Sequence, residues 1–515
     1  MHPIRLGIFC VMASSYLLQG TPHAYGQDVW YEARKFLPND GSVYDFFGQA
    51  VGISGTTGIV GTHYDDTNGR YAGAAYLIDT STNTQIAKLL AEDGSTGDYF
   101  GYSVSISETV CIVGAYSDSD NGNVSGSAYL FDTRTAMQSA KLLPADGERG
   151  DRFGYSVATE EDVCVVGAPY DGDNAYQSGS AYLFETGTGR QRAKLLATDG
   201  ATMDYFGHSA AISGTACLVG APEDEDNGNN SGSAYLFDTR TGTQIAKLLP
   251  EDGATYDNFG YSVAISGTIC IVGAYGDDVV GRSSGSAYLF DTSTGTQIAK
   301  LLPQDGAADD YFGLSVAISG TTAIVGAKHN DDFAKNSGSA YLFDTSTGTQ
   351  IAKLLPSDGA IRDRFGHAVA ISGTTYLVTA PDDDDYGEKS GSAYIFHPVV
   401  PCLQLSIDNL VAGEVATFTI TNGTPGVNAV VVCGRKPGSS IVSGFSGYCA
   451  TFGIGDLTMT NIIGGLDLQF DANGEIVFEQ RIAPRASGRY FYVQAAMQGT
   501  CPDACVSNLL RLTVQ

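Results

Sequence analysis

The sequence predicts an all-β protein in which a seven-bladed β-propeller is followed by a small β-sandwich domain. Three observations predict this fold. A Phe-Gly pair recurs seven times with a spacing of 53 residues, and each repeat holds four short apolar segments bounded by Gly, Asp or Ser. After residue 400 the repeat is replaced by unrelated segments of strand length. Four antiparallel strands per repeat, seven times over, are typical of propeller blades.

The first 26 residues predict a signal peptide. Arg5 supplies a positive start, residues 6–18 are apolar, and Ala24 and Gly26 place small residues before a cleavage point at Gln27. No later segment has about 18 consecutive apolar residues, so we expect no membrane span. The sequence therefore predicts a secreted or cell-surface protein with the signal at 1–26, the propeller at 27–400 and the sandwich at 401–515.

The composition is strongly acidic. Among 515 residues, Asp and Glu number 57 against 28 Lys and Arg, which gives a formal net charge of −29. This charge disfavours nucleic acid and anionic membrane surfaces as partners. It suits cation binding or solubility outside the cell.

Each repeat is expected to fold as one four-stranded blade. One unit reads FGYSVAIS, TICIVGAY, an acidic loop, SGSAYLFDT, a Thr-Gly turn and QIAKLLP. The turn before the last strand carries Gly189, Gly242, Gly295 and Gly348, with Asn83 in another copy, and these residues accept a left-handed backbone. Ala136 holds the same position, so we expect slight strain there.

The ring is expected to close through its N-terminal strand. The seventh repeat ends at Val400 without a QIAKLLP segment, whereas an orphan copy, residues 32–38, precedes the first Phe-Gly. Pairing of this segment with the last blade would leave no exposed edge at the junction. An open stack with a frayed first strand is the alternative.

The repeats resemble FG-GAP repeats, the blades of the integrin α-subunit head and of many secreted bacterial proteins. Phe-Gly is followed by Gly167-Ala168-Pro169 and Gly220-Ala221-Pro222, and the resemblance covers roughly residues 30–398. It implies a propeller but little about function. Integrin-type repeats often place a calcium loop between Phe-Gly and Gly-Ala-Pro. Here the loop within this interval has shrunk to Ser-Gly-Thr, a plain turn, so that family site cannot be carried over.

Acidic residues lie instead between Gly-Ala-x and Ser-Gly-Ser. Alternating carboxylates around a Gly bend offer the oxygen ligands that Ca²⁺ requires, although no loop has a complete calcium-binding frame. Calcium binding is one interpretation, and solvated Asx turns are the other. The predicted calcium ligands are Asp118, Asp120, Asp171, Asp173, Asp224, Asp226, Asp383 and Asp385.

Two further Asp columns repeat in every blade. One precedes Gly, from Asp40 to Asp358, and the other stands two residues before Phe-Gly, from Asp45 to Asp363. Because a binding site normally breaks internal symmetry, we expect these carboxylates to cap blade-to-blade turns through backbone N–H groups.

The residue after Phe-Gly varies between blades. This position carries Gln49 and Leu314 in two blades and predicted binding residues in the other five. A polar and aromatic column at one end of the ring or along its axis suits an extracellular protein or glycan ligand. Ordinary repeat drift explains it equally well. The predicted binding residues are Tyr102, Tyr155, His208, Tyr261 and His367.

The cysteines form two groups. Cys111, Cys164, Cys217 and Cys270 share one strand position in consecutive blades, too far apart for disulfides, and we expect buried thiols. Five more cysteines follow the propeller, and their arithmetic allows two disulfides with the pairing left open. They are Cys402, Cys433, Cys449, Cys501 and Cys505.

The sequence offers no catalytic constellation: HExxH is absent and no GxSxG stands at a strand–turn–helix elbow. We therefore predict a monomeric, non-catalytic binding or adhesion protein of the cell exterior, with calcium as its candidate cofactor. A secreted glycan-active hydrolase and a purely structural surface protein are the alternatives. An enzyme would need one asymmetric cleft with a carboxyl of raised pKa.

Overall fold

The computed structural model describes residues 30–398 continuously and, beyond them, the backbone of separate strands between 404 and 513. Glu32–His397 form one compact unit, and the chain from Pro398 onward belongs to another. Each is described by itself. The predicted signal peptide, 1–26, lies outside the described residues. Every regular element described is a β-strand, which confirms the predicted all-β class. In the part of the chain that is described, no helix has the length and apolarity needed to cross a membrane.

The first three blades each consist of four consecutive antiparallel strands. Blade 1 contains β2 (Ala50–Ser54), β3 (Thr57–Thr62), β4 (Ala74–Asp79) and β5 (Thr84–Leu89). Blade 2 contains β6 (Ser103–Ile106), β7 (Val110–Ala115), β8 (Ser127–Asp132) and β9 (Gln138–Leu142). Blade 3 contains β10 (Ser156–Glu160), β11 (Val163–Ala168), β12 (Ser180–Glu185) and β13 (Gln191–Leu195).

The next three blades repeat this order. Blade 4 contains β14 (Ser209–Ser213), β15 (Ala216–Ala221), β16 (Ser233–Asp238) and β17 (Gln244–Leu248). Blade 5 contains β18 (Ser262–Ser266), β19 (Ile269–Ala274), β20 (Ser286–Asp291) and β21 (Gln297–Leu301). Blade 6 contains β22 (Ser315–Ser319), β23 (Thr322–Ala327), β24 (Ser339–Asp344) and β25 (Gln350–Leu354).

Blade 7 joins the two ends of the ring, as the sequence predicts. Its sheet has the order β1-β28-β27-β26, so the N-terminal strand β1 (Trp30–Phe36) completes a blade made otherwise of β26 (Val369–Ser372), β27 (Thr375–Ala380) and β28 (Ser392–Pro398). Glu32 of β1 accepts hydrogen bonds from Ser357, just as glutamines of the other outer strands accept one from the preceding blade connection. The closing strand therefore reproduces the fourth strand of an ordinary blade.

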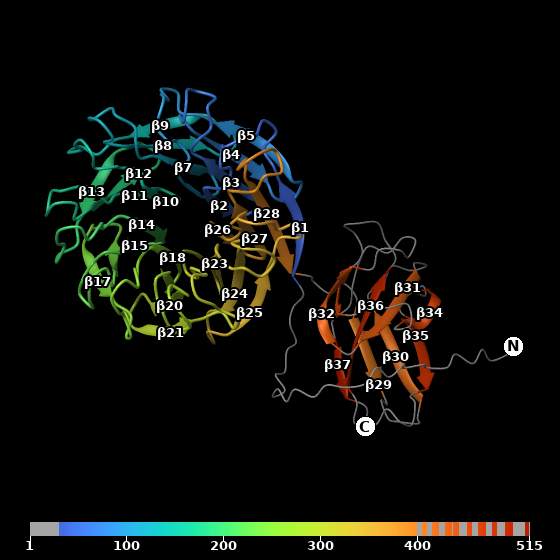
Figure 1. Cartoon of the computed structure of the whole chain (residues 1–515). Helices are drawn as coiled ribbons and strands as arrows, with labels where there is room; N and C mark the ends of the chain where they lie inside the picture. The colour runs from blue at the N-terminus through green and yellow to red at the C-terminus, as the bar shows by residue number, and fades with distance from the viewer. Residues whose placement is uncertain are drawn as a thin grey trace. The chain divides into compact units, whose positions relative to one another are not determined.

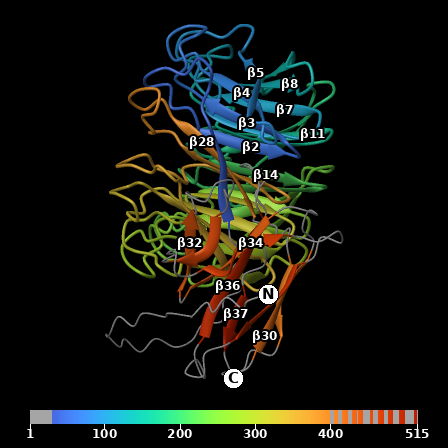
Figure 2. The ribbon, with the colours of Figure 1, turned by 90° about the vertical axis from the view of Figure 1, so that its right-hand side faces the viewer.

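The blades surround a central axis with their first strands innermost (Figure 1). The first strands of neighbouring blades contact one another around the whole ring, from β2 through β6, β10, β14, β18, β22 and β26 back to β2. Figure 2 shows β2 to β5 in their order within the twisted sheet of blade 1. Residues just before a first strand and just after a second strand consequently lie at one end of the axis.

The Phe-Gly pair forms the joint between blades. Phe153 is fully buried, and its backbone N–H donates to the carbonyl of Ser125 in the preceding blade at 2.9 Å. A Cβ on Gly126 would stand 2.0 Å from the carbonyl oxygen of Phe153, and Gly126 has a φ of +83°. The same bridge occurs seven times, including Phe47 with Gly391 at the closure. The glycines of the repeat thus allow backbones of adjacent blades to touch.

The turns before the outer strands adopt the predicted left-handed conformation. Gly189, Gly242, Gly295 and Gly348 have φ between 67° and 70°, and Asn83 has 57°. Ala136 has φ 56°, so the expected strain falls on a residue with a Cβ. The four predicted thiols, Cys111, Cys164, Cys217 and Cys270, are free and buried in the interfaces between blades.

The C-terminal unit consists of two main sheets, the arrangement that the predicted β-sandwich requires. A sheet of three strands has the order β29-β30-β35, a sheet of four has β34-β31-β36-β37, and β32 pairs with β33. The disulfide prediction lies outside the residues whose side chains are described. The strands are β29 (Gln404–Asp408), β30 (Val415–Thr421), β31 (Asn428–Gly434), β32 (Lys436–Ile441), β33 (Thr451–Gly455), β34 (Ile462–Gln469), β35 (Ile476–Arg481), β36 (Tyr490–Met497) and β37 (Leu510–Thr513).

Candidate functional site

The acidic loops predicted to bind calcium connect the second and third strands of each blade. In blade 2, Asp118 is buried at the base of its loop, where Oδ1 accepts the backbone N–H of Asp120 at 3.0 Å. Its Oδ2 accepts the hydroxyl of Tyr129, a fully buried side chain of β8, at 2.9 Å. The Asx turn that the sequence suggested is therefore present.

A lysine lies at the centre of the carboxylates in these loops. Lys141 Nζ is 2.7 Å from Asp93, 3.0 Å from Asp118 and 2.6 Å from Asp120. The strand register explains the meeting, because Lys141 on β9 stands directly opposite Tyr129 on β8. The same three-carboxylate arrangement surrounds Lys194 with Asp146, Asp171 and Asp173, and Lys247 with Asp199, Asp224 and Asp226. We call these groups the lysine–aspartate clusters.

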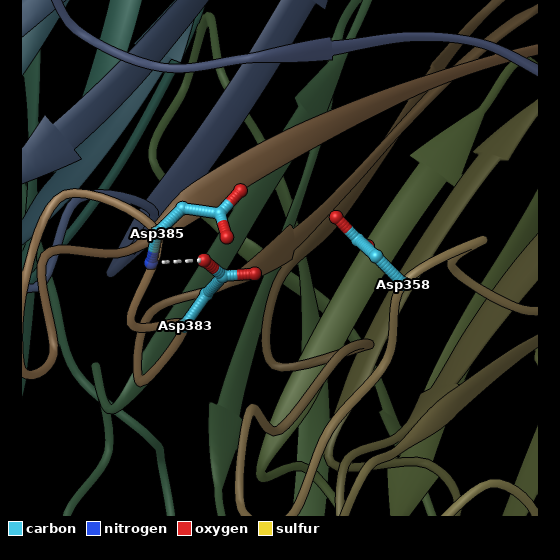
Figure 3. Close-up of side chains that lie close together, drawn as sticks. All are labelled: Asp358, Asp383 and Asp385. Carbon is cyan, nitrogen blue, oxygen red and sulfur yellow. Dashed lines mark hydrogen bonds between the residues drawn. The ribbon is translucent and has the colours of Figure 1, made fainter.

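The cluster of blade 7 is completed by the closing strand. Asp358, Asp383 and Asp385 converge on one point with carboxylate oxygens within 4.8 Å of one another, and Asp383 accepts the backbone N–H of Asp385 (Figure 3). Lys35 of β1 binds all three, at 2.8, 2.8 and 2.6 Å. Burial lowers the pKa of Lys35, but hydrogen bonds to the three carboxylates outweigh burial and raise it overall. The ammonium group of Lys35 thus offsets the mutual repulsion of these three carboxylates.

Three blades vary the arrangement. Thr67 replaces the third acid in blade 1 and binds Lys88 at 2.8 Å, whereas Val279 replaces it in blade 5. In blade 6 the buried acid is replaced by Asn330, so Lys353 pairs only with the partly exposed Asp305 and Asp332. The repeat thus contains a natural series of clusters with different buried charge.

The two constant Asp columns have different roles. Asp98 Oδ2 accepts the backbone N–H of Ser95 at 2.7 Å, and its counterparts cap the equivalent turns, as expected. Burial raises the pKa of Asp98 to about 6, although the N–H bond opposes this shift. The Asp40 column differs from the expectation, because Asp93 binds Lys141 and thereby ties the blade connection to the outer strand.

The structure brings four of the five predicted binding residues into one row at the axis. Ring centroids are 5.0 Å apart between Tyr102 and Tyr155, 5.1 Å between Tyr155 and His208, and 4.6 Å between His208 and Tyr261. All four are half-buried. The fifth, His367, lies in blade 7, which does not adjoin blades 2 to 5 that carry the other four. We call this position, from Gln49 to His367, the axial column.

His208 is held in one neutral form within this row. Its Nδ1 lies 3.2 Å from the carbonyl oxygen of Tyr261, which can only accept, so Nδ1 carries the proton. Nε2 therefore accepts from the hydroxyl of Tyr155 at 3.5 Å. Burial lowers the pKa of His208 to about 4, which keeps the ring uncharged at neutral pH.

A second set of aromatic side chains extends the row outward. Tyr116 lies 4.5 Å from Tyr102, and Tyr275 lies 4.6 Å from Tyr261, measured between ring centroids. Arg152 stacks 3.9 Å from the centre of the Tyr170 ring. Together with the axial tyrosines and His208, these half-buried rings form what we call the aromatic face. Its outer members are Tyr64, Tyr71, Tyr99, Tyr116, Tyr170, Tyr205, Tyr275 and Tyr311.

Sequence reasoning missed both the cluster lysines and the outer tyrosines. The lysines recur with the period of 53 in every outer strand, and this periodicity could have revealed them. Tyr99, Tyr205 and Tyr311 share the position before Phe-Gly, which varies as the axial column does. These columns remained unconnected because only the fold shows that they meet at one end of the axis.

Comparison with known proteins identifies the repeat. The sequence profile of the FG-GAP repeat matches seven segments, residues 30–78, 83–131, 136–184, 190–237, 243–290, 296–343 and 349–396. No curated protein matches the chain.

Two solved structures match parts of the chain. A dihydro-heme d1 dehydrogenase, NirN, in complex with DHE matches with 13% identity and a TM-score of 0.40, over 73% of this chain and 64% of its own. This chain thus spans just under two thirds of that protein. A europium-containing methanol dehydrogenase matches with 11% identity and a TM-score of 0.36, over 68% of this chain and 81% of its own.

Proposed function

The chain belongs to the FG-GAP repeat family, and we propose that it is a non-catalytic binding protein of the cell exterior that holds a glycan or protein ligand on its aromatic face. The single observation that carries this proposal is the aromatic face itself. Tyrosines that stay partly exposed in a continuous strip leave apolar ring surface in contact with water, and tyrosines are enriched where proteins bind partners.

The position of these rings supports a binding role over a purely structural one. The phenylalanines and tyrosines that hold the blades together, such as Phe153 and Tyr182, are fully buried and repeat in every blade. The aromatic face follows no such symmetry, since the axial column carries Gln49 and Leu314 in two blades. A surface that departs from the repeat while the core keeps it favours a ligand over a packing requirement.

Calcium binding by the acidic loops stays the alternative interpretation. In blades 2, 3, 4 and 7 the carboxylates predicted as its ligands all bind a lysine ammonium in the structure. Calcium at these clusters would have to displace that lysine, so we propose that the lysines, rather than a metal, neutralise the loops. We likewise propose that residues 1–26 direct export of the chain.

Substitutions that copy another blade test the binding role. Tyr155→Leu and Tyr261→Leu place in blades 3 and 5 the residue that blade 6 carries at Leu314, and so preserve the repeat. Tyr386→Ala is a matched control, because Tyr386 is exposed and lies outside the aromatic face. The measurement is binding of labelled mature protein to arrays of extracellular glycans and extracellular matrix proteins.

We expect each leucine variant to lose about 30-fold in affinity, since truncating a central aromatic side chain costs about 2 kcal/mol or more. The control should bind as the wild type does. Equal binding by all three variants, or no binding by the wild type, would contradict the proposal and leave a structural role.

A further inference from the structure

Arginine precedes Phe-Gly in two blades, as Arg152 in blade 3 and as Arg364 in blade 7. In blade 7, Nη1 of Arg364 lies 2.9 Å from a carboxylate oxygen of Asp382, which follows the second strand. In blade 3 the corresponding position after the second strand is held by Tyr170. The arginine of blade 7 therefore has a carboxylate partner in its own blade, whereas Arg152 meets an aromatic ring.

The guanidinium group of Arg152 lies in the middle of the aromatic face. Its central carbon is 3.9 Å from the centre of the Tyr170 ring and 5.8 Å from the centre of the Tyr116 ring. The centroids of these two rings lie 6.4 Å and 5.8 Å, respectively, from that of Tyr155 in the axial column. Because a cation is attracted to the faces of aromatic rings, these contacts hold the group at a defined place beside the axial column.

This guanidinium group has no acceptor of its own. Within residues 30–398, the half-buried side chain of Arg152 forms no hydrogen bond and no ion pair. Its nitrogen atoms are not among the buried unpartnered atoms of this range, so solvent reaches them. Glu223, whose charge also acts on the Tyr205 ring, hydrogen-bonds Asn230 instead. In a chain with 57 acidic residues, a half-buried cation without a carboxylate needs an explanation, because such groups are normally paired.

Two hydroxyl groups beside this cation are also free. In the same described range, the hydroxyls of Tyr116 and Tyr170 have no hydrogen-bond partner, and neither oxygen is buried. A guanidinium group presents its N–H groups in one plane, where a carboxylate or a sulfate can accept two of them together. A tyrosine hydroxyl can both donate and accept. The three groups together match a molecule that carries an anionic oxygen group next to hydroxyl groups.

We propose that Arg152 binds the carboxylate or sulfate group of an anionic sugar in a glycan, while the hydroxyls of Tyr116 and Tyr170 bind the hydroxyl groups of that sugar. This inference rests on the proposed function and specifies its ligand. A glycan fits this site better than a protein does, because each sugar combines hydroxyl groups with apolar C–H faces that pack on aromatic rings. Since the net charge of −29 repels polyanions, the favoured glycan carries isolated anionic sugars among neutral ones.

The test compares matched glycans. Labelled mature protein is applied to an array of neutral oligosaccharides that each carry one glucuronate, one galacturonate or one sulfated galactose. The array also holds the methyl esters and the desulfated forms of the same oligosaccharides, together with extracellular matrix proteins. The affinities for the strongest anionic ligand and for its neutral counterpart are then measured by calorimetry, and the array shows whether the carboxylate or the sulfate is preferred.

Two variants remove the guanidinium group without departing from the repeat. Arg152→Tyr copies blades 2, 4 and 6, and Arg152→Asn copies blade 5. Tyr99 and Asn258, at the same position, have φ of 57° and 55°, against 57° for Arg152, so both side chains fit its backbone conformation. Arg149→Thr is the matched control, because it removes the same charge from an exposed arginine of the same blade connection and copies blades 2, 4 and 5.

We expect the anionic glycan to bind at least about tenfold more tightly than its neutral counterpart, because a hydrogen bond to a charged group is lost with the charge. Both Arg152 variants should lose this preference and still bind the neutral form, whereas Arg149→Thr should keep it. A preference that survives in both Arg152 variants, equal binding of charged and neutral glycans, or binding to proteins alone would overturn the anionic-sugar site and leave the proposed function standing. Binding to no glycan and no protein would overturn both.

Discussion

Replacing Lys141 by methionine removes the cation from a cluster that contains a buried acid. Of its three carboxylates, Asp118 is 3% exposed as a residue, whereas the side chains of Asp93 and Asp120 are 47% and 54% exposed. Breaking a buried ion pair by removing one partner costs about 3–5 kcal/mol, and an exposed pair contributes about 0–1 kcal/mol. The remaining bond from Tyr129 to Asp118 reduces the loss. We therefore expect Lys141→Met to lower the free energy of unfolding by about 3 kcal/mol.

Blade 6 supplies the matched control. Lys353 has the same place in its blade, but Asn330 stands where the buried acid would be, and both of its carboxylate partners are partly exposed. Lys353→Met should therefore cost about 1 kcal/mol or less. Because the same methionine is introduced in both variants, their difference of about 2 kcal/mol reports the uncompensated charge of Asp118.

Urea unfolding, followed by circular dichroism, measures these differences by linear extrapolation. Adding Asp118→Asn to Lys141→Met reproduces the charge pattern that blade 6 has in the Lys353→Met variant, and should recover most of the lost stability. The reasoning would be refuted if Lys353→Met were as destabilising as Lys141→Met, or if the double variant recovered nothing.

Three further predictions follow from the fold and its charges. Gly126→Ala should destabilise the fold by several kcal/mol, because the added Cβ would stand 2.0 Å from a backbone oxygen. Gly214→Ala should cost about 1 kcal/mol, because Gly214 has a φ of +56° but nothing lies within 4 Å of the added Cβ. Equal midpoints of urea unfolding for the two variants would contradict this prediction. Burial raises the pKa of Asp98, Asp151 and Asp204 from 3.8 to about 6, so the native state binds more protons in this window and stability should rise as pH falls from 7 to 5. Below about pH 3.8 stability should fall, because the lysine-bound carboxylates with lowered pKa, such as Asp93, become protonated. A free energy of unfolding that falls steadily from pH 7 downward would contradict this pH dependence. After chelation, millimolar Ca²⁺ should leave the melting temperature unchanged, and a rise of several degrees that Mg²⁺ does not reproduce would show calcium sites in the acidic loops.

The blades could be predicted from the sequence alone because Phe-Gly recurs every 53 residues with no insertion or deletion. Counted with this spacing, residues 32–38 belong to no blade and the last blade lacks its outer strand. The closing of the ring through the N-terminal strand could therefore be predicted. The lysine–aspartate clusters required more. Lys141 follows Asp118 by 23 residues, and the two meet only through the register of β8 with β9.

The candidate binding surface was predictable in part for a similar reason. The axial column was visible as a variable position next to a constant one, which identified Tyr155 and His208. The outer tyrosines belong to other sequence positions, which meet the axial column only at one end of the axis in the folded ring.

The closure through β1 also determines how the propeller would bear mechanical load. The chain leaves the ring from β28, which lies inside its sheet with β27 on one side and β1 on the other. Tension transmitted through residue 398 would therefore act on two hydrogen-bonded ladders together, instead of peeling a single edge strand from the rim. Lys35 of β1 adds three ionic contacts with Asp358, Asp383 and Asp385, which lie before β28 in the chain. A ring closed in this way resists pulling where the rest of the chain is attached.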